Sequence, residues 1–130
     1  MPAPVRVLVL DDQSIAIEIV ADILESEGGY RVEGVRTITA ARTSIAASLP
    51  DVLILDIVLG GIGSEDREGR TFLADLRSTP ATATLPVILM SAQHVLEEES
   101  AGDAHTAQLA KPYDLVELLS VVDRLTPARS

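Results

Sequence analysis

Asp56 is an acidic residue whose apolar neighbours suggest that it has a chemical role. It lies within an apolar run, with Ile54 and Leu55 before it and Ile57 and Val58 after it. Burying an unpaired carboxylate is unfavourable, so an acid in such a run either reaches water at the end of a strand or belongs to a polar site. For one isolated acid the first explanation would suffice.

Other polar residues stand in comparable places. Asp11 and Asp12 follow the aliphatic run 5–10, Ser91 follows the run 86–90, and Lys111 follows the weaker run 107–110. Carboxylates brought close together repel one another, and a bound cation removes the conflict. Oxygen ligands without His or Cys suit a hard ion, and a site that leaves room for phosphate and water suits Mg²⁺. These residue types therefore favour a magnesium-dependent phosphate site.

Phosphoryl transfer is the chemistry that this set could support. A carboxylate can act as the nucleophile and form an acyl phosphate. The ammonium of Lys111 could meet the phosphoryl group, and the hydroxyl of Ser91 could donate to one of its oxygens. Asp56 is the best candidate nucleophile because it stands alone at a strand end, whereas adjacent Asp11 and Asp12 are better suited to holding metal.

Alternating strands and helices must bring these residues together. Strands are expected at 5–10, 30–35, 52–56, 86–90 and 107–110. Helices are expected from 14 to 28, from 38 to 49, around 72–78, over 94–101 and from 115 to 125. Such alternation predicts an α/β fold, with one doubly wound, five-stranded parallel sheet covered by helices on both faces. In such sheets, sites collect at the carboxyl ends of the strands.

Helical periodicity also predicts which faces are buried. In the first helix Ile15, Ile19 and Ile23 recur every four residues, with Ala16, Val20 and Leu24 beside them, and Gly28-Gly29 ends the helix. In the last helix Asp114 is expected to cap the amino end with Glu117. Its expected buried stripe consists of Leu115, Leu118, Leu119, Val122 and Leu125.

Composition limits the classes of function. A chain of 130 residues suits one domain, expected to span 1–130, and without cysteine it has neither disulfides nor thiolate metal sites. The formal net charge of −10 argues against direct nucleic-acid binding, so protein partners are expected. With neither a membrane-spanning run nor a basic leader in this sequence, we expect no membrane association and a cytoplasmic location.

Four stretches, taken together, resemble the receiver domain of two-component response regulators, whose flavodoxin-like sheet has the order 2-1-3-4-5. They are VLVLDDQS (7–14), PDVLILDIVLGG (50–61), LPVILMSA (85–92) and LAKPYDLVELL (109–119). The resemblance implies that Asp56 accepts a phosphoryl group from a sensor histidine kinase or a phosphotransfer protein. It implies that Asp12 binds Mg²⁺ directly and Asp11 mostly through water, that Asp56 and the Val58 carbonyl complete the ligands, and that Ser91 and Lys111 meet the phosphoryl group.

The sequence departs from the family pattern in two places. Gln108 stands three residues before the lysine, where family members usually carry an aromatic residue whose rotation reports phosphorylation. We therefore expect either a switch that runs through the backbone and Ser91, without an aromatic rotation, or an unusual output surface. The stretch 60–67 is interpreted as a loop insertion of about five residues, which loops tolerate at small entropic cost.

His94 and His105 are expected to be surface imidazoles.

The predicted function is a phosphoacceptor switch, which is not an enzyme apart from slow hydrolysis of its own acyl phosphate. Two alternatives remain. A phosphatase of the haloacid-dehalogenase type also uses Asp, Mg²⁺, Ser and Lys, but Asp11-Asp12-Gln13 lacks that class's Asp-x-Asp pair. A pseudo-receiver would keep the fold as a scaffold without phosphorylation. The sequence leaves open a homodimer, and it fits either a stand-alone receiver or a receiver taken from a larger regulator.

Overall fold

The computed structural model describes residues 4–56, 64–91, 105–110 and 113–126. Strands and helices alternate along most of this chain. The elements are β1 (Arg6–Leu10), α1 (Ser14–Gly28), β2 (Arg31–Val35), α2 (Ile38–Ala47), β3 (Val52–Asp56), α3 (Ser64–Ser78), β4 (Val87–Ser91), β5 (Thr106–Ala110) and α5 (Leu115–Leu125). The predicted short helix over 94–101 lies outside the described residues.

The five strands form one parallel sheet in the order β2-β1-β3-β4-β5. The predicted doubly wound, flavodoxin-like architecture is therefore confirmed. Strand order reverses beside β1, because the chain passes from β1 outward to β2 and then returns to β3 on the other side. In such sheets a crevice opens at the carboxyl ends of the strands near this reversal.

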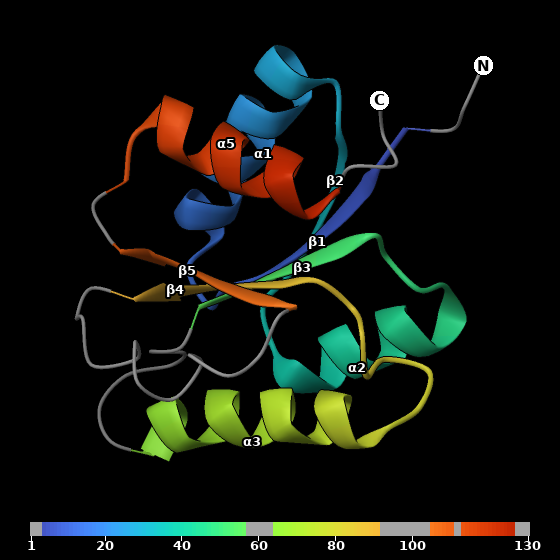
Figure 1. Ribbon diagram of the computed structural model, residues 1–130. Coiled ribbons are helices and arrows are strands. Elements are labelled where there is room, and N and C mark those ends of the chain that lie inside the picture. The colour runs from blue at the N-terminus through green and yellow to red at the C-terminus, as the bar shows by residue number, and fades with distance from the viewer. Residues whose placement is uncertain (1–3, 57–63, 92–104, 111–112, 127–130) are drawn as a thin grey trace.

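Helices cover both faces of the sheet, as Figure 1 shows. Val20, Leu24, Leu118, Val121 and Val122, from α1 and α5, pack against one face of the sheet. On the opposite face, Ala41 from α2 packs with Phe72 and Leu76 from α3. Alternate residues of each inner strand enter the two cores, which is why these strands read as continuous apolar runs.

Local signals fix several helix ends. The φ of Gly29 is 70°, and its backbone N–H donates to the Leu24 carbonyl, which ends α1 in the left-handed conformation that glycine tolerates. At the start of α5, Asp114 Oδ1 accepts from the Glu117 amide at 2.8 Å, and Glu117 Oε1 accepts from the Asp114 amide at 3.0 Å. The predicted capping of α5 by Asp114 is confirmed.

The predicted buried faces of α1 and α5 were partly wrong. Ile15 and Ile19 are 63% and 49% exposed, whereas Val20 and Leu24 are buried. In α1 two neighbouring rows are apolar, and periodicity does not tell which of them faces the sheet. Leu115 of α5 is likewise 39% exposed, and Val121, outside the predicted stripe, is buried.

The start of α3 also corrects the sequence interpretation. Residues 64–67, which had been placed in a loop insertion, form the first turn of α3. The loop interpretation failed because the apolar residues that mark this helix begin only at Phe72.

No described helix has both the length and the apolar character needed to span a membrane.

Candidate functional site at the carboxyl edge of the sheet

Asp11 and Asp56 lie next to each other at the carboxyl edge of the sheet. β1 and β3 pair directly, with Leu10 opposite Leu55, and each of these leucines is followed by one of the two acids. Neighbouring strands are about 4.8 Å apart, so the two backbones are close at this point. Asp11 and Asp56 are only 4% and 6% exposed. Two carboxylates are therefore removed from bulk water at one place.

Strand alternation places the side chains of Asp11 and Asp56 on the same face of the sheet. Val9 and Ile54, two residues before Asp11 and Asp56, belong to the core under α1 and α5. Because side chains in a strand repeat every second residue, Asp11 and Asp56 continue the rows on that side of the sheet. They therefore stand where the turn from β1 into α1 begins, and that turn carries Asp12.

The turn from β1 into α1 is held by hydrogen bonds. The Asp11 amide donates to the Val35 carbonyl at 3.1 Å, and Asp11 Oδ1 accepts from the Gln13 amide at 2.9 Å. The Asp12 carbonyl accepts from Nε and Nη2 of Arg36, at 3.2 and 3.1 Å. Asp12 itself is half-buried. The end of β2 thus fixes the turn that bears both acids.

The backbone also brings the predicted serine to this edge. Ser91 is the last residue of β4 and pairs with Ala110, and Asp56 pairs with Met90, one residue earlier. Lys111 follows Ala110 in the sequence. Lys111 and Val58 lie outside the described residues, as does the side chain of Ser91, so their predicted roles stay predictions.

The described acids suit a hard cation in their chemistry. Asp11, Asp12 and Asp56 supply oxygen atoms only, and two of them are buried side by side, where repulsion favours a bound positive ion. Within the described part of the chain, however, no three or more acidic, His or Cys side chains form a group that could hold a metal ion. The three-carboxylate magnesium site therefore stays a prediction.

Comparison with known proteins decides the family. A family model described as the response regulator receiver domain matches residues 7–123. The chain belongs to this family. It is thus a receiver domain of the kind that works in two-component signalling, as the four sequence stretches predicted.

Among curated relatives, this receiver domain is 29% identical over 127 residues to the response regulator Rre1 of Synechocystis sp., with 96% of this chain and 53% of the relative covered. It is 34% identical over 130 residues to the response regulator MprA of Mycolicibacterium vanbaalenii, covering 95% of this chain and 53% of the relative. The chain spans about half the length of these curated relatives.

Solved structures share the fold of this receiver domain. A putative response regulator from Chloroflexus aurantiacus superimposes with a TM-score of 0.83 at 28% identity, covering 96% of this chain and 99% of the other. The receiver domain of a sensor histidine kinase from Pseudomonas aeruginosa PAO1 has a TM-score of 0.78 at 22% identity, covering 96% and 99%. The latter structure has a magnesium ion coordinated in its active-site cleft.

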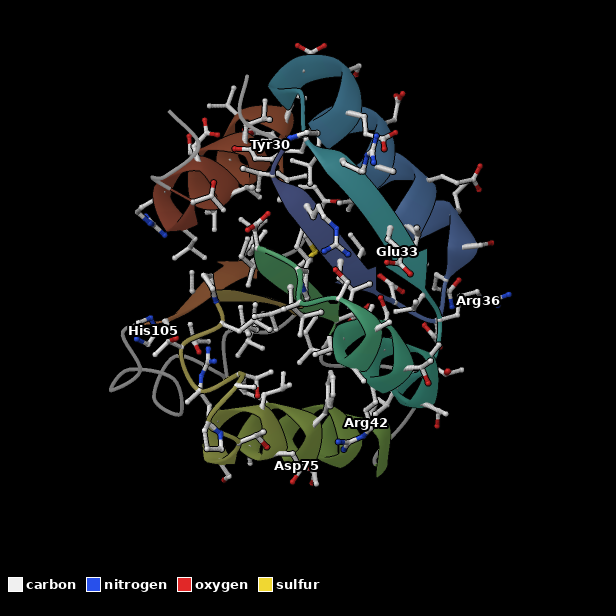
Figure 2. The ribbon with its side chains drawn as sticks, turned by 90° about the vertical axis from the view of Figure 1, so that its right-hand side faces the viewer. Tyr30, Glu33, Arg36, Arg42, Asp75 and His105 are labelled. Atoms are coloured by element: carbon white, nitrogen blue, oxygen red, sulfur yellow. The ribbon has the colours of Figure 1, made fainter. Side chains whose placement is uncertain are left out.

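Sequence reasoning missed Arg36 in this receiver domain. The predicted site residues lie at the ends of β1, β3, β4 and β5, whereas Arg36 follows Val35 at the end of β2 (Figure 2). The available signal was a charged residue directly after a strand that neighbours β1. The side chain of His105 is exposed, as expected of a surface imidazole, and His94 lies outside the described residues.

Proposed function

We propose that this receiver domain accepts a phosphoryl group on Asp56 and that the modification changes its contacts with other proteins. The observation that carries the proposal is the burial of Asp56 beside Asp11, at the carboxyl edge of adjacent parallel strands. Burying two carboxylates at one place costs desolvation free energy even where each has an interaction partner. The presence of this pair at the edge where such sheets bind ligands supports a role in chemistry.

In the proposed reaction a carboxylate oxygen of Asp56 attacks the phosphorus of a phosphohistidine on the donor protein. A new O–P bond forms and the P–N bond breaks, and the histidine nitrogen leaves with the electron pair and is protonated by solvent. Lys111 pairs with the transferred group, and Ser91 donates a hydrogen bond to one of its oxygens. The domain has no further turnover beyond slow hydrolysis of its own acyl phosphate.

The proposed metal ligands are Asp12 directly, Asp11 mostly through water, and Asp56 with the Val58 carbonyl. Bound Mg²⁺ would neutralise charge on the phosphoryl oxygens as they approach these acids. The oxygen-only donor set supports this assignment. The magnesium ion in the receiver domain from Pseudomonas aeruginosa, which shares the fold, is consistent with it.

The proposed partners are proteins. The donor is a histidine kinase or a phosphotransfer protein, and the output is a change in binding to a downstream protein in the cytoplasm. The formal net charge of −10 argues against nucleic-acid binding by this domain.

The switch runs without the usual aromatic rotation, because Gln108 occupies that position. Equal affinity of a captured partner for the phosphorylated and unphosphorylated forms would contradict the switching role.

Measurement of intact mass after incubation with a small acyl phosphate, with and without Mg²⁺, tests the phosphoacceptor. We expect one magnesium-dependent phosphoryl adduct, lost in Asp56→Asn. Asp51→Asn is the matched control, because Asp51 is an exposed acid at the opposite edge of the sheet, where its Oδ2 accepts from the Arg6 amide at 2.8 Å.

The other outcomes separate the alternatives. An adduct that persists in Asp56→Asn would place the phosphoryl group elsewhere. Absence of any adduct would favour the pseudo-receiver scaffold, and rapid turnover of a generic phosphate ester would favour a phosphatase.

A further inference from the structure

We propose that Arg36 is a positioning residue that holds the acid-bearing turn between β1 and α1 in the geometry required for binding Mg²⁺. This inference rests on the proposed function, because it concerns the same site. Arg36 acts through the main chain of Asp12, whose carbonyl it contacts.

The contact of Arg36 with the turn is specific. Its Nε and Nη2 both donate to the Asp12 carbonyl, at 3.2 and 3.1 Å, across a separation of 24 residues. Hydrogen bonds from a charged donor are stronger than neutral ones, and two donors on one planar group restrict direction as well as distance. The carbonyl between Asp12 and Gln13 is therefore fixed from β2.

Only part of the support for this turn is local: Asp11 Oδ1 accepts from the Gln13 amide, at 2.9 Å. Gln13, the N-cap residue of α1, makes no side-chain capping hydrogen bond. The Asp11 amide is held by the Val35 carbonyl, at 3.1 Å, and the Asp12 carbonyl by the next residue, Arg36. Two consecutive residues at the end of β2 thus fix two consecutive residues of the acid-bearing turn.

Arg36 could act on magnesium in two ways with opposite signs. As a positive charge near the acids it would repel Mg²⁺, so its removal would strengthen binding. As a restraint on the turn it would favour binding, and its removal would weaken it. The Arg36 side chain and both of its hydrogen bonds are exposed, so salt screens the longer-range repulsion of Mg²⁺ strongly, whereas water weakens the short contact with the Asp12 carbonyl only in part. The positioning effect should therefore dominate.

Two substitutions separate these effects. Arg36→Gln removes the charge and the two-donor contact, whereas Arg36→Lys keeps the charge but lacks the planar pair of donors. Positioning predicts weaker Mg²⁺ binding in both variants. Pure charge repulsion predicts tighter binding in Arg36→Gln and no change in Arg36→Lys.

The experiment is a calorimetric Mg²⁺ titration of the unphosphorylated chain. We expect the dissociation constant for Mg²⁺ to rise about threefold to tenfold in Arg36→Gln, which corresponds to the net contribution of one hydrogen bond. It should also rise measurably in Arg36→Lys. Hydrogen exchange at the Gln13 amide should accelerate in both. Arg42→Gln is the control, because it removes the same charge from an arginine that pairs with Asp75, at 2.7 Å, and should leave binding unchanged.

Unchanged or tighter Mg²⁺ binding in Arg36→Gln would overturn the positioning role, as would a natural chain that binds no Mg²⁺. Magnesium binding is measured without a phosphoryl donor, so the two proposals can fail separately. A chain that binds Mg²⁺ in an Arg36-dependent way but never gains an adduct would contradict the phosphoacceptor role alone.

Discussion

The two edges of the sheet use charged side chains differently. At the amino edge, Arg77 in the last turn of α3 donates to the Leu85 carbonyl at 2.8 Å and to Thr106 Oγ1 at 2.9 Å. At the carboxyl edge, Asp11 and Asp56 are buried side by side. The arginine joins three segments of the chain, whereas the acids place two carboxylates of the same charge at one point. The amino edge therefore joins separate segments of the chain, whereas the carboxyl edge gathers the acids to which we assign cation binding.

Replacement of Arg77 by methionine should give the largest loss of stability. The Arg77 guanidinium also lies within hydrogen-bond distance of the Thr82 and His105 carbonyls, at 3.3 and 3.2 Å, so its removal leaves several acceptors at the starts of β4 and β5 without this donor. We expect the free energy of unfolding to fall by about 2–4 kcal/mol. Urea unfolding followed by circular dichroism measures it.

Arg31→Met serves as the control for that variant, because Arg31 is an exposed arginine at the same edge, at the start of β2. It should change stability by less than about 0.5 kcal/mol. Equal losses in the two variants would show that the Arg77 network carries no special weight.

Magnesium should stabilise the protein through the carboxyl edge only. A ligand that binds only the folded state at roughly 10 to 100 times its dissociation constant adds about 1.4–2.7 kcal/mol to the free energy of unfolding. Asp56→Asn should lose most of this gain, since it removes one buried carboxylate. Asp51→Asn, at the amino edge, should keep it.

Urea unfolding in Mg²⁺ and in chelator measures these differences. In chelator, Asp56→Asn should differ little from the natural protein, because the ion that this acid is proposed to bind is absent from both. A clear destabilisation of Asp56→Asn in chelator would mean that Asp56 supports the fold itself, and the contrast between the edges would fail.

The sequence predicted the contrast only in part. Alternation of strands and helices, and the rule that parallel strands end at one edge, were enough to place Asp11, Asp56 and Ser91 together. The contacts of Arg36 and Arg77 could not be predicted, because most of their acceptors are main-chain carbonyls distant in sequence or in irregular turns. The exposure of Ile15 was missed for another reason: two adjacent rows of α1 are apolar, and only tertiary packing selects the row that faces the sheet.

Asp114→Ala tests whether every acid near the carboxyl edge belongs to the site. α5 follows β5, so its first turn lies on the side of the sheet where that strand ends, yet Asp114 is engaged in a reciprocal capping box with Glu117. Loss of the cap should lower the free energy of unfolding by about 1 kcal/mol. Glu117→Gln should retain most of the stability, because glutamine also completes the box. The adduct measured by intact mass should form in both variants, and its loss in Asp114→Ala would extend the site to α5.

The smallest effect is expected from the ion pair of Arg42 and Asp75, which lies on the surface between α2 and α3. The two side chains are 50% and 52% exposed with an N···O distance of 2.7 Å, and the Arg42 guanidinium also lies 5.0 Å from the centre of the Phe72 ring. A double-mutant cycle with Arg42→Ala and Asp75→Ala isolates the pair from the ring contact, because only the pair is lost in both single variants. We expect a coupling free energy of about 0.5 kcal/mol that falls further in about 1 M salt. A coupling of about 2 kcal/mol or more would show that one exposed ion pair can stabilise this fold as much as the Arg77 network at the amino edge. Burial would then not explain why charged side chains contribute differently in different regions of the molecule.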